Sequence, residues 1–148
     1  MMSKTMLLIA ISATLLSVAA TSGGEGFEIS LNNKMMIQRF GGDINATNSL
    51  QLNQSLSGGQ LTIKYHHCGR VGKNRIVTLK DSRDKIVKEW RYADVATPVA
   101  AMTCNVKDIL SVKKAGNNVF KLYYSSSELP NGRLLTNVVL GNNVAALR

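Results

Sequence analysis

The sequence lacks the short motifs that mark the common nucleotide-binding and hydrolytic sites. It has no glycine-rich phosphate-binding loop, no His-Glu-x-x-His zinc motif and no Gly-x-Ser-x-Gly nucleophile elbow. It also has only 9 Asp and Glu residues, which are scattered, so a catalytic pair of carboxylates would have to be assembled by the fold. These absences favour a protein that binds over one that catalyses. A small extracytoplasmic enzyme, with a site that only the fold brings together, is the first alternative.

Long hydrophobic runs are missing after residue 20. Before that point, Lys4 precedes the uncharged run MLLIAISATLL at positions 6–16, and small residues follow. This layout is typical of a secretory signal peptide, and the run is shorter than the ~20 apolar residues that span a bilayer. We therefore expect a signal peptide over residues 1–20, export to the periplasm or the extracellular space, and no integral membrane segment in the mature protein. A flexible leader over residues 21–26 should precede one domain over residues 27–148.

Cysteine is limited to Cys68 and Cys104. Two cysteines in an exported chain most simply form one disulfide, and we expect that bridge here. The two positions are 104 − 68 = 36 residues apart. Loop-closure entropy gives a bridge over such a distance a stabilising effect of about 4 kcal/mol.

The two histidines, His66 and His67, stand directly before Cys68. Imidazole and thiolate bind zinc or copper, so a metal-binding protein that uses His66 and Cys68 is the second alternative. Neighbouring residues of a strand point to opposite faces, however, so His66 and His67 cannot both bind one ion unless the strand bends. We expect no cofactor and no metal, and a Cys–His nucleophile built on Cys104 has no supporting motif.

Acidic residues are outnumbered by basic ones, with 9 Asp and Glu against 18 Lys and Arg. Removal of Lys4 with the signal peptide leaves 17 − 9 = +8. Such a charge favours anionic polymers or acidic glycans as ligands, and in an exported protein nucleic acid is a poor candidate. The basic residues are spread along the chain, so part of this charge serves solubility.

Alternation of apolar and polar residues is the main secondary-structure signal. Phe27–Leu31 alternates strictly, Asn32-Asn33 suits a tight turn because Asn tolerates positive φ, and Lys34–Phe40 predicts the returning strand. The clearest hairpin joins Arg75–Lys80 to Lys85–Tyr92 through a turn rich in Asp.

Helical signals collect only between Asn105 and Gly116. Asn105 suits an N-cap and Gly116 a C-terminal stop, which predicts a helix over Val106–Lys114. Further on, Pro130–Gly132 predicts a tight turn before a last strand over Arg133–Leu140.

About eight or nine short strands at regular spacing predict an all-β protein. We expect a single antiparallel β-sandwich, immunoglobulin-like or jelly-roll-like, with one short helix. The residues expected in its core are Ile29, Leu52, Ile63, Leu79, Trp90, Phe120, Leu122 and Val138.

The candidate ligand-binding residues are Tyr123, Lys121 and Arg91. Alternation over Val119–Ser125 turns Tyr124 toward the core and Tyr123 outward, beside Lys121. Arg91, between two aromatic residues, is the third candidate. The function that these features favour is an exported, non-catalytic binding module for a partner protein or for an anionic or glycan ligand.

Two sites match the N-glycosylation pattern, Asn45-Ala46-Thr47 and Asn53-Gln54-Ser55. They would carry a glycan only in a host that modifies secreted proteins in this way. Otherwise we expect Asn45 and Asn53 to be ordinary turn and strand residues.

Overall fold

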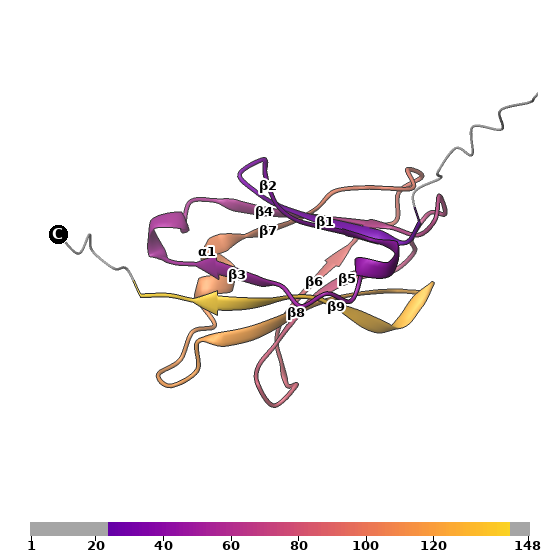
Figure 1. Ribbon diagram of the computed structural model, residues 1–148. Helices are drawn as coiled ribbons and strands as arrows, with labels where there is room; N and C mark the ends of the chain where they lie inside the picture. The colour runs from indigo at the N-terminus through magenta and orange to yellow at the C-terminus, as the bar shows by residue number, and fades with distance from the viewer. Residues whose placement is uncertain (1–23, 143–148) are drawn as a thin grey trace, which may run out of the picture.

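The computed structural model describes residues 24–142, and these form two packed β-sheets (Figure 1). The predicted signal peptide lies outside the described residues and stays a prediction. The four-stranded sheet has the order β2-β1-β4-β7, and its strands are β1 (Gly26–Leu31), β2 (Lys34–Phe40), β4 (Gln60–His66) and β7 (Met102–Asn105). The five-stranded sheet has the order β3-β9-β8-β5-β6, and its strands are β3 (Ser49–Leu52), β5 (Arg75–Lys80), β6 (Ile86–Tyr92), β8 (Val119–Ser126) and β9 (Leu129–Leu140).

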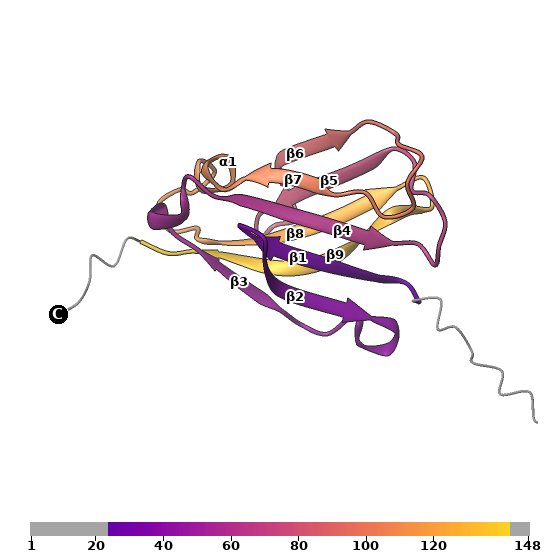
Figure 2. The same ribbon diagram turned by 90° about the horizontal axis from the view of Figure 1, so that it is seen from above.

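Short helical segments occupy the ends of this sandwich. They are the 3-10 turns η1 (Gly41–Asp43) and η2 (Gln54–Leu56) and the helix α1 (Val106–Leu110). Figures 1 and 2 place α1 at one end and the turn after β2 at the opposite end. The predicted all-β sandwich with one short helix is therefore confirmed. No helix among the described residues is long and apolar enough to cross a membrane.

All strand pairs but one are antiparallel, as expected. The exception is β3, which runs parallel to β9 and pairs Leu50 with Val138. The chain reaches this position by leaving β2, making η1 and crossing to the edge of the other sheet. The loop between η1 and β3 is thereby placed against β9, and this contact builds the candidate site.

The core lies between the two sheets, where alternate residues of each strand meet. Seven of the eight predicted core residues are at most 1% exposed, and Trp90 alone is half-buried. Trp90 faces inward, since its cross-strand partner Val77 is fully buried, but it sits on the edge strand β6. By strand alternation Ile86 would share a face with Trp90, but it is 52% exposed. A register shift between the partners of Leu79 and Lys80 turns it outward.

The predicted hairpins form as expected, because their turn residues adopt the required conformations. Asn32 and Asn33 have φ of 50° and 66°, which joins β1 to β2, and Asp84 has φ of 61° in the turn between β5 and β6. The predicted turn at Pro130–Gly132 is wrong. Those residues belong to β9, and the chain reverses at Ser127 and Glu128 instead.

Two other boundaries differ from the prediction. The helix ends at Leu110 rather than at Lys114, and the side chain of Asn105 does not cap it. Gly26, the last residue of the predicted leader, is instead the first residue of β1. A Cβ at Gly26 would lie 2.0 Å from Cδ1 of Phe40, so glycine is needed for the two strands to pack here.

The predicted disulfide is wrong, because Cys68 and Cys104 are both free thiols in the structure. Cys104 is buried in β7 opposite Leu61 of β4, whereas Cys68 is exposed in the turn after β4. The 68 − 61 = 7 residues between Leu61 and Cys68 correspond to roughly 20 Å along a strand. A disulfide needs Cα atoms within about 7 Å, so this register rules the bridge out.

Candidate functional site

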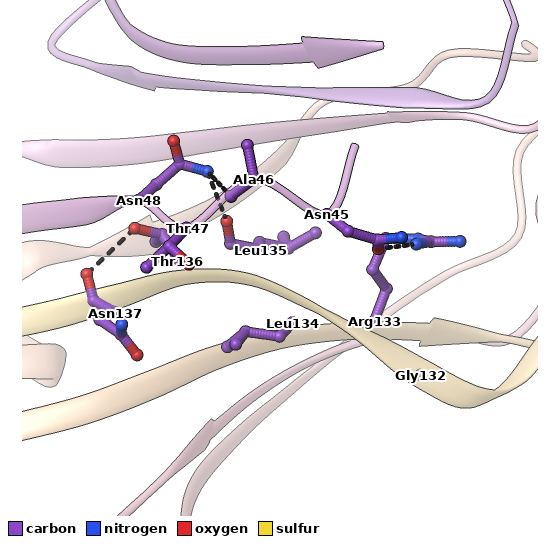
Figure 3. Close-up of a pocket in the computed structure, with 10 residues that line it drawn as sticks. All are labelled: Asn45, Ala46, Thr47, Asn48, Gly132, Arg133, Leu134, Leu135, Thr136 and Asn137. Carbon is purple, nitrogen blue, oxygen red and sulfur yellow. Dashed lines mark hydrogen bonds between the residues drawn. The ribbon is translucent and has the colours of Figure 1, made fainter. Parts of the chain in front are cut away.

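A hollow of about 350 Å³ lies between the loop that precedes β3 and the middle of β9. Asparagine and threonine make up half of its lining (Figure 3). We call it the amide hollow, and its residues are Asn45, Ala46, Thr47, Asn48, Gly132, Arg133, Leu134, Leu135, Thr136 and Asn137. Its volume falls within the range of roughly 300–1,000 Å³ that small-molecule sites occupy.

Arg133 fixes one end of the amide hollow. Its Nε donates to the hydroxyl of Tyr65 at 2.8 Å, its Nη1 to Oδ1 of Asn45 at 2.6 Å and its Nη2 to Oε1 of Glu25 at 3.2 Å. One guanidinium thus joins β9, β4, the loop after η1 and the residue before β1. Because these partners use all three nitrogens, the Arg133 side chain is held in one orientation.

The charge of Arg133 is balanced within this group. The hydroxyl of Tyr65 donates to Glu25, and Glu25 forms an ion pair with Arg133. Burial acts to raise the pKa of Glu25, but the Tyr65 hydrogen bond and the Arg133 charge outweigh it and hold that pKa below its usual value. Burial and the Glu25 carboxylate raise the pKa of Tyr65, so the phenol stays neutral. The hollow is therefore polar but close to electrically neutral at this end.

Asn48 fixes the other part of the loop. Its Nδ2 donates to the carbonyls of Ala46 at 2.8 Å and Leu135 at 3.4 Å, and its Oδ1 accepts from Arg39 of β2. The backbone N–H of Asn137 also donates to the carbonyl of Asn48 at 3.0 Å. These bonds attach the loop to both sheets, and they use both amide hydrogens of Asn48 and one of the two lone pairs of its Oδ1.

Other polar groups of the amide hollow keep their capacity. Among the described residues, the Thr47 hydroxyl, the Asn45 amide nitrogen and the Asn137 side-chain amide have no hydrogen-bond partner. Thr47 and Asn45 are exposed and Asn137 is half-buried. The arrangement therefore combines a rigid frame with free donors and acceptors. It can hydrogen-bond a hydroxyl-rich molecule, and it holds no group poised to transfer a proton at neutral pH.

A second polar cluster brings His67, Tyr124 and Ser126 together inside the sandwich. His67 Nε2 lies 2.8 Å from the Tyr124 hydroxyl and 3.5 Å from Oγ of Ser126. His67 and Ser126 are each 5% exposed, and a Cβ at Gly72 would lie 3.0 Å from both the His67 ring and the Tyr124 hydroxyl. Both hydroxyls share one ring nitrogen in a closed, packed space. The cluster consequently stabilises the core and offers no room for a substrate.

The metal candidates do not gather. His66 faces outward and pairs with Glu28 at 2.9 Å, whereas His67 faces the core, so the two histidines point to opposite sides as expected. Cys68 is exposed in the following turn, with φ of 55°. Within residues 24–142, no group of three or more His, Cys, Asp or Glu side chains is placed to hold a metal ion.

The predicted contact residues Tyr123, Lys121 and Arg91 lie on the outer face of the five-stranded sheet, and none of them lines the amide hollow. Lys121 and Tyr123 are nevertheless its neighbours, because they pair across β8 and β9 with Asn137 and Leu134. Each contacts a charged neighbour within the protein. Lys121 pairs with Asp84 at 2.9 Å, Arg91 pairs with Glu89 at 2.7 Å, and the ammonium of Lys80 lies 4.3 Å from the centre of the Tyr123 ring. Their role in ligand binding stays a prediction.

The two N-glycosylation patterns have different surroundings. Asn45 lines the amide hollow, so a glycan there would stand at its mouth. Asn53 caps η2 by accepting from the backbone N–H of Ser55 at 3.0 Å. Glycosylation of either residue stays a prediction.

Several residues that line or support the amide hollow were not expected to be functional. Glu25 was assigned to the leader, Arg133 to a strand and Asn137 to no role. Their sequence positions, 25, 133 and 137, are too far apart for a motif to link them. The only available signal was the frequency of Asn and Thr in the loop at positions 45–48.

Comparison with known proteins adds little. No protein-family model matches the chain, and no curated protein matches it. Among solved structures, the extracellular domain of a B. thetaiotaomicron protein assigned as a one-component system matches 83% of this chain, with a TM-score of 0.37 and 14% identity. A structure from the same organism, the extracellular domain of an assigned hybrid two-component system, matches 80% with a TM-score of 0.36 and 15% identity. The chain spans 16% and 15% of those two chains, and we base no function on a likeness of this size.

Proposed function

We propose that this protein is a non-catalytic binding module that acts outside the cytoplasm and holds a hydroxyl-rich carbohydrate in the amide hollow. The observation that carries this proposal is the set of free amide and hydroxyl groups on a frame fixed by Arg133 and Asn48. Sugar hydroxyls donate and accept hydrogen bonds, and so do Asn side chains, so the two chemistries match. The export part of the proposal rests on the signal-peptide pattern of residues 1–20.

The electrostatics favour a neutral ligand over an anion at this position. Arg133 is the only charged residue that lines the amide hollow, and its charge is met by Glu25. An anion would therefore have to compete with an existing ion pair. A neutral ligand needs only the unused groups of Asn45, Thr47 and Asn137. Because hydrogen bonds already hold Arg133 and Asn48 in place, these two side chains lose little conformational entropy when the ligand binds.

The proposal is tested by titrating the isotope-labelled protein with neutral xylo-, manno- and malto-oligosaccharides and recording amide NMR spectra. At least one series should shift the signals of Asn45, Thr47 and Asn137 in a saturable way. Asn137→Ala removes one free amide, so it should weaken that binding by roughly fivefold, the effect of one neutral hydrogen bond.

Asn105→Ala is the matched control. Asn105 is exposed on β7 of the other sheet, and its side chain does not cap α1. This variant should bind like the parent protein. The proposal fails if no series shifts the signals of the amide hollow, or if the two variants lose affinity equally.

A further inference from the structure

Two more hollows meet at the end of the molecule where α1 lies and β9 ends. One, of about 480 Å³, lies between β6 and the segment after α1, and the other, of about 720 Å³, lies between that segment and the end of β9. Both are lined by Lys114 and Asn117, which close a short turn by pairing with each other. The two hollows therefore form one continuous surface on either side of this turn.

Four lysines border that surface, and we call them the lysine rim: Lys85, Lys88, Lys113 and Lys114. The lining holds a single carboxylate, Asp81, which leaves a local charge of 4 − 1 = +3. Oδ1 of Asp81 accepts from the backbone N–H of Arg83 at 2.8 Å and of Lys85 at 3.0 Å. That carboxylate is thus already engaged by the turn between β5 and β6.

The lysine rim is not neutralised within the described residues. The salt bridges among residues 24–142 involve His66, Arg91, Lys121 and Arg133, so none of them includes a lysine of the rim. Lys113 donates to the side chain of Asn142 rather than to a carboxylate. The positive charge is consequently directed at solvent, where it attracts anions.

The uncharged groups between the lysines indicate the chemistry of the ligand. Side-chain amides of Gln54, Asn117, Asn118 and Asn142 line the larger hollow, and they can bond hydroxyl groups. The edge of β6, by contrast, is poorly suited to adding a strand from a partner protein. It carries Lys88, is directly preceded by Lys85 and has an irregular register opposite Leu79 and Lys80, and such features block strand pairing.

We propose that the lysine rim and its two hollows bind a linear anionic polysaccharide, with the acidic groups at the lysines and the sugar hydroxyls at the amides. This ligand class differs from the neutral carbohydrate assigned to the amide hollow, and the two surfaces share no residue. The charge pattern, the amide lining and the continuity of the two hollows all match a chain rather than a single small anion.

The test is isothermal titration with short heparin oligosaccharides and short oligogalacturonates, with dextran as the neutral probe. At least one of the two anionic probes should bind, and dextran should not bind at this surface. The affinity should fall steeply between 0.1 M and 1 M salt, because the Debye length shrinks from ~10 Å to ~3 Å. The double variant Lys88→Gln with Lys114→Gln should bind roughly tenfold more weakly.

A charge-matched control separates a site from general attraction. Lys34→Gln with Lys64→Gln removes the same charge from exposed positions on β2 and β4 of the other sheet. This variant should lose less than about twofold. Equal losses in the two double variants, salt-independent binding or no binding of either anionic probe would overturn the proposal. Tighter binding of a polyglutamate peptide than of both oligosaccharides would assign the surface to an acidic protein and would also overturn it. Asn137→Ala should leave this binding unchanged, so a failure here is distinguishable from a failure of the proposed function.

Discussion

His67 is the buried titratable side chain whose environment has the clearest consequence for stability. It is 5% exposed, and burial lowers its pKa, although the carboxylates of Glu128 and Glu25 act in the opposite direction. The folded protein therefore resists protonation of His67 at a pH where the unfolded chain accepts a proton. Because the unfolded state binds more protons, the free energy of unfolding must rise with pH in this window.

We expect the protein to lose stability as pH falls from about 7.5 toward 5.5, since the unfolded histidine titrates near ~6.5. The slope should not exceed about 1.4 kcal/mol per pH unit for this one proton. Urea unfolding of the parent and of His67→Gln at a series of pH values checks this. The variant should be less stable at pH 7.5 but should show a smaller pH dependence. A parent protein whose stability shows no slope in this window would contradict the argument.

The two cysteines differ in reactivity for a physical reason. Burial raises the pKa of the Cys104 thiol to about 11, against a hydrogen bond with Tyr92, whereas Cys68 is exposed. The thiolate is the reactive form, so iodoacetamide at pH 8 should modify Cys68 in the folded protein and Cys104 only after denaturation. Mass spectrometry of digested samples checks the order. If neither thiol reacted after denaturation without reductant, the two cysteines would be joined in the predicted disulfide.

At the scale of elements, the hairpins could be predicted because their signals are local. Alternation in β1, the β-branched residues of β5 and the Asn or Asp residues in their turns lie within a few positions of one another. The errors occurred where distant contacts decide. Pro130–Gly132 has turn composition, yet pairing with β8 keeps it inside β9, and the predicted disulfide failed because strand register separates the cysteines.

The pairing of β1 with β2 offers a sharp test at a single glycine. A Cβ at Gly26 would approach Cδ1 of Phe40 to 2.0 Å and the carbonyl oxygen of Arg39 to 2.6 Å. Because the second contact is with backbone, rotation of the Phe40 ring cannot relieve it. Gly26→Ala should destabilise the protein by about 1–3 kcal/mol, as overpacking does elsewhere.

Chemical denaturation checks this value, and the chain supplies its own control two residues away. A Cβ at Gly24 would meet nothing within 4 Å, so Gly24→Ala should change the free energy of unfolding by less than about 0.5 kcal/mol. Equal effects of the two substitutions would mean that β1 does not begin at Gly26.

At the scale of the whole molecule, the two-sheet fold could be predicted from the sequence, but the two proposed binding sites could not. An all-β sandwich follows from the number and period of the strands. The amide hollow depends instead on β3 lying parallel to β9, which brings Asn45 against Arg133 although 133 − 45 = 88 residues separate them. The lysine rim likewise joins β6 to the turn after α1. Neither contact leaves a local pattern, so contact residues were expected on the sheet face at Tyr123 instead.

The arrangement of the two proposed sites predicts that they act independently. The amide hollow lies beside the loop after η1 and along the middle of β9, whereas the lysine rim lies beside α1, where β9 ends. Although β9 reaches both, β8 pairs with it from Leu129 to Val139 and β3 pairs with its last four residues, so we expect no second arrangement of this strand. Coupling between two sites requires an element with two alternative arrangements. Each ligand would then change the affinity for the other by the same factor. Saturation with a neutral oligosaccharide should therefore change the affinity for an anionic one by less than about twofold.

Thermal unfolding offers a second measure of this independence. Each ligand at 100 times its dissociation constant should stabilise the protein by about 2.7 kcal/mol, and two independent ligands should stabilise it by the sum. Asn137→Ala should remove only the neutral contribution, and the Lys88→Gln, Lys114→Gln variant only the anionic one. Competition between the two ligands, seen as stabilisation no greater than that of either alone, would mean that a single surface binds both.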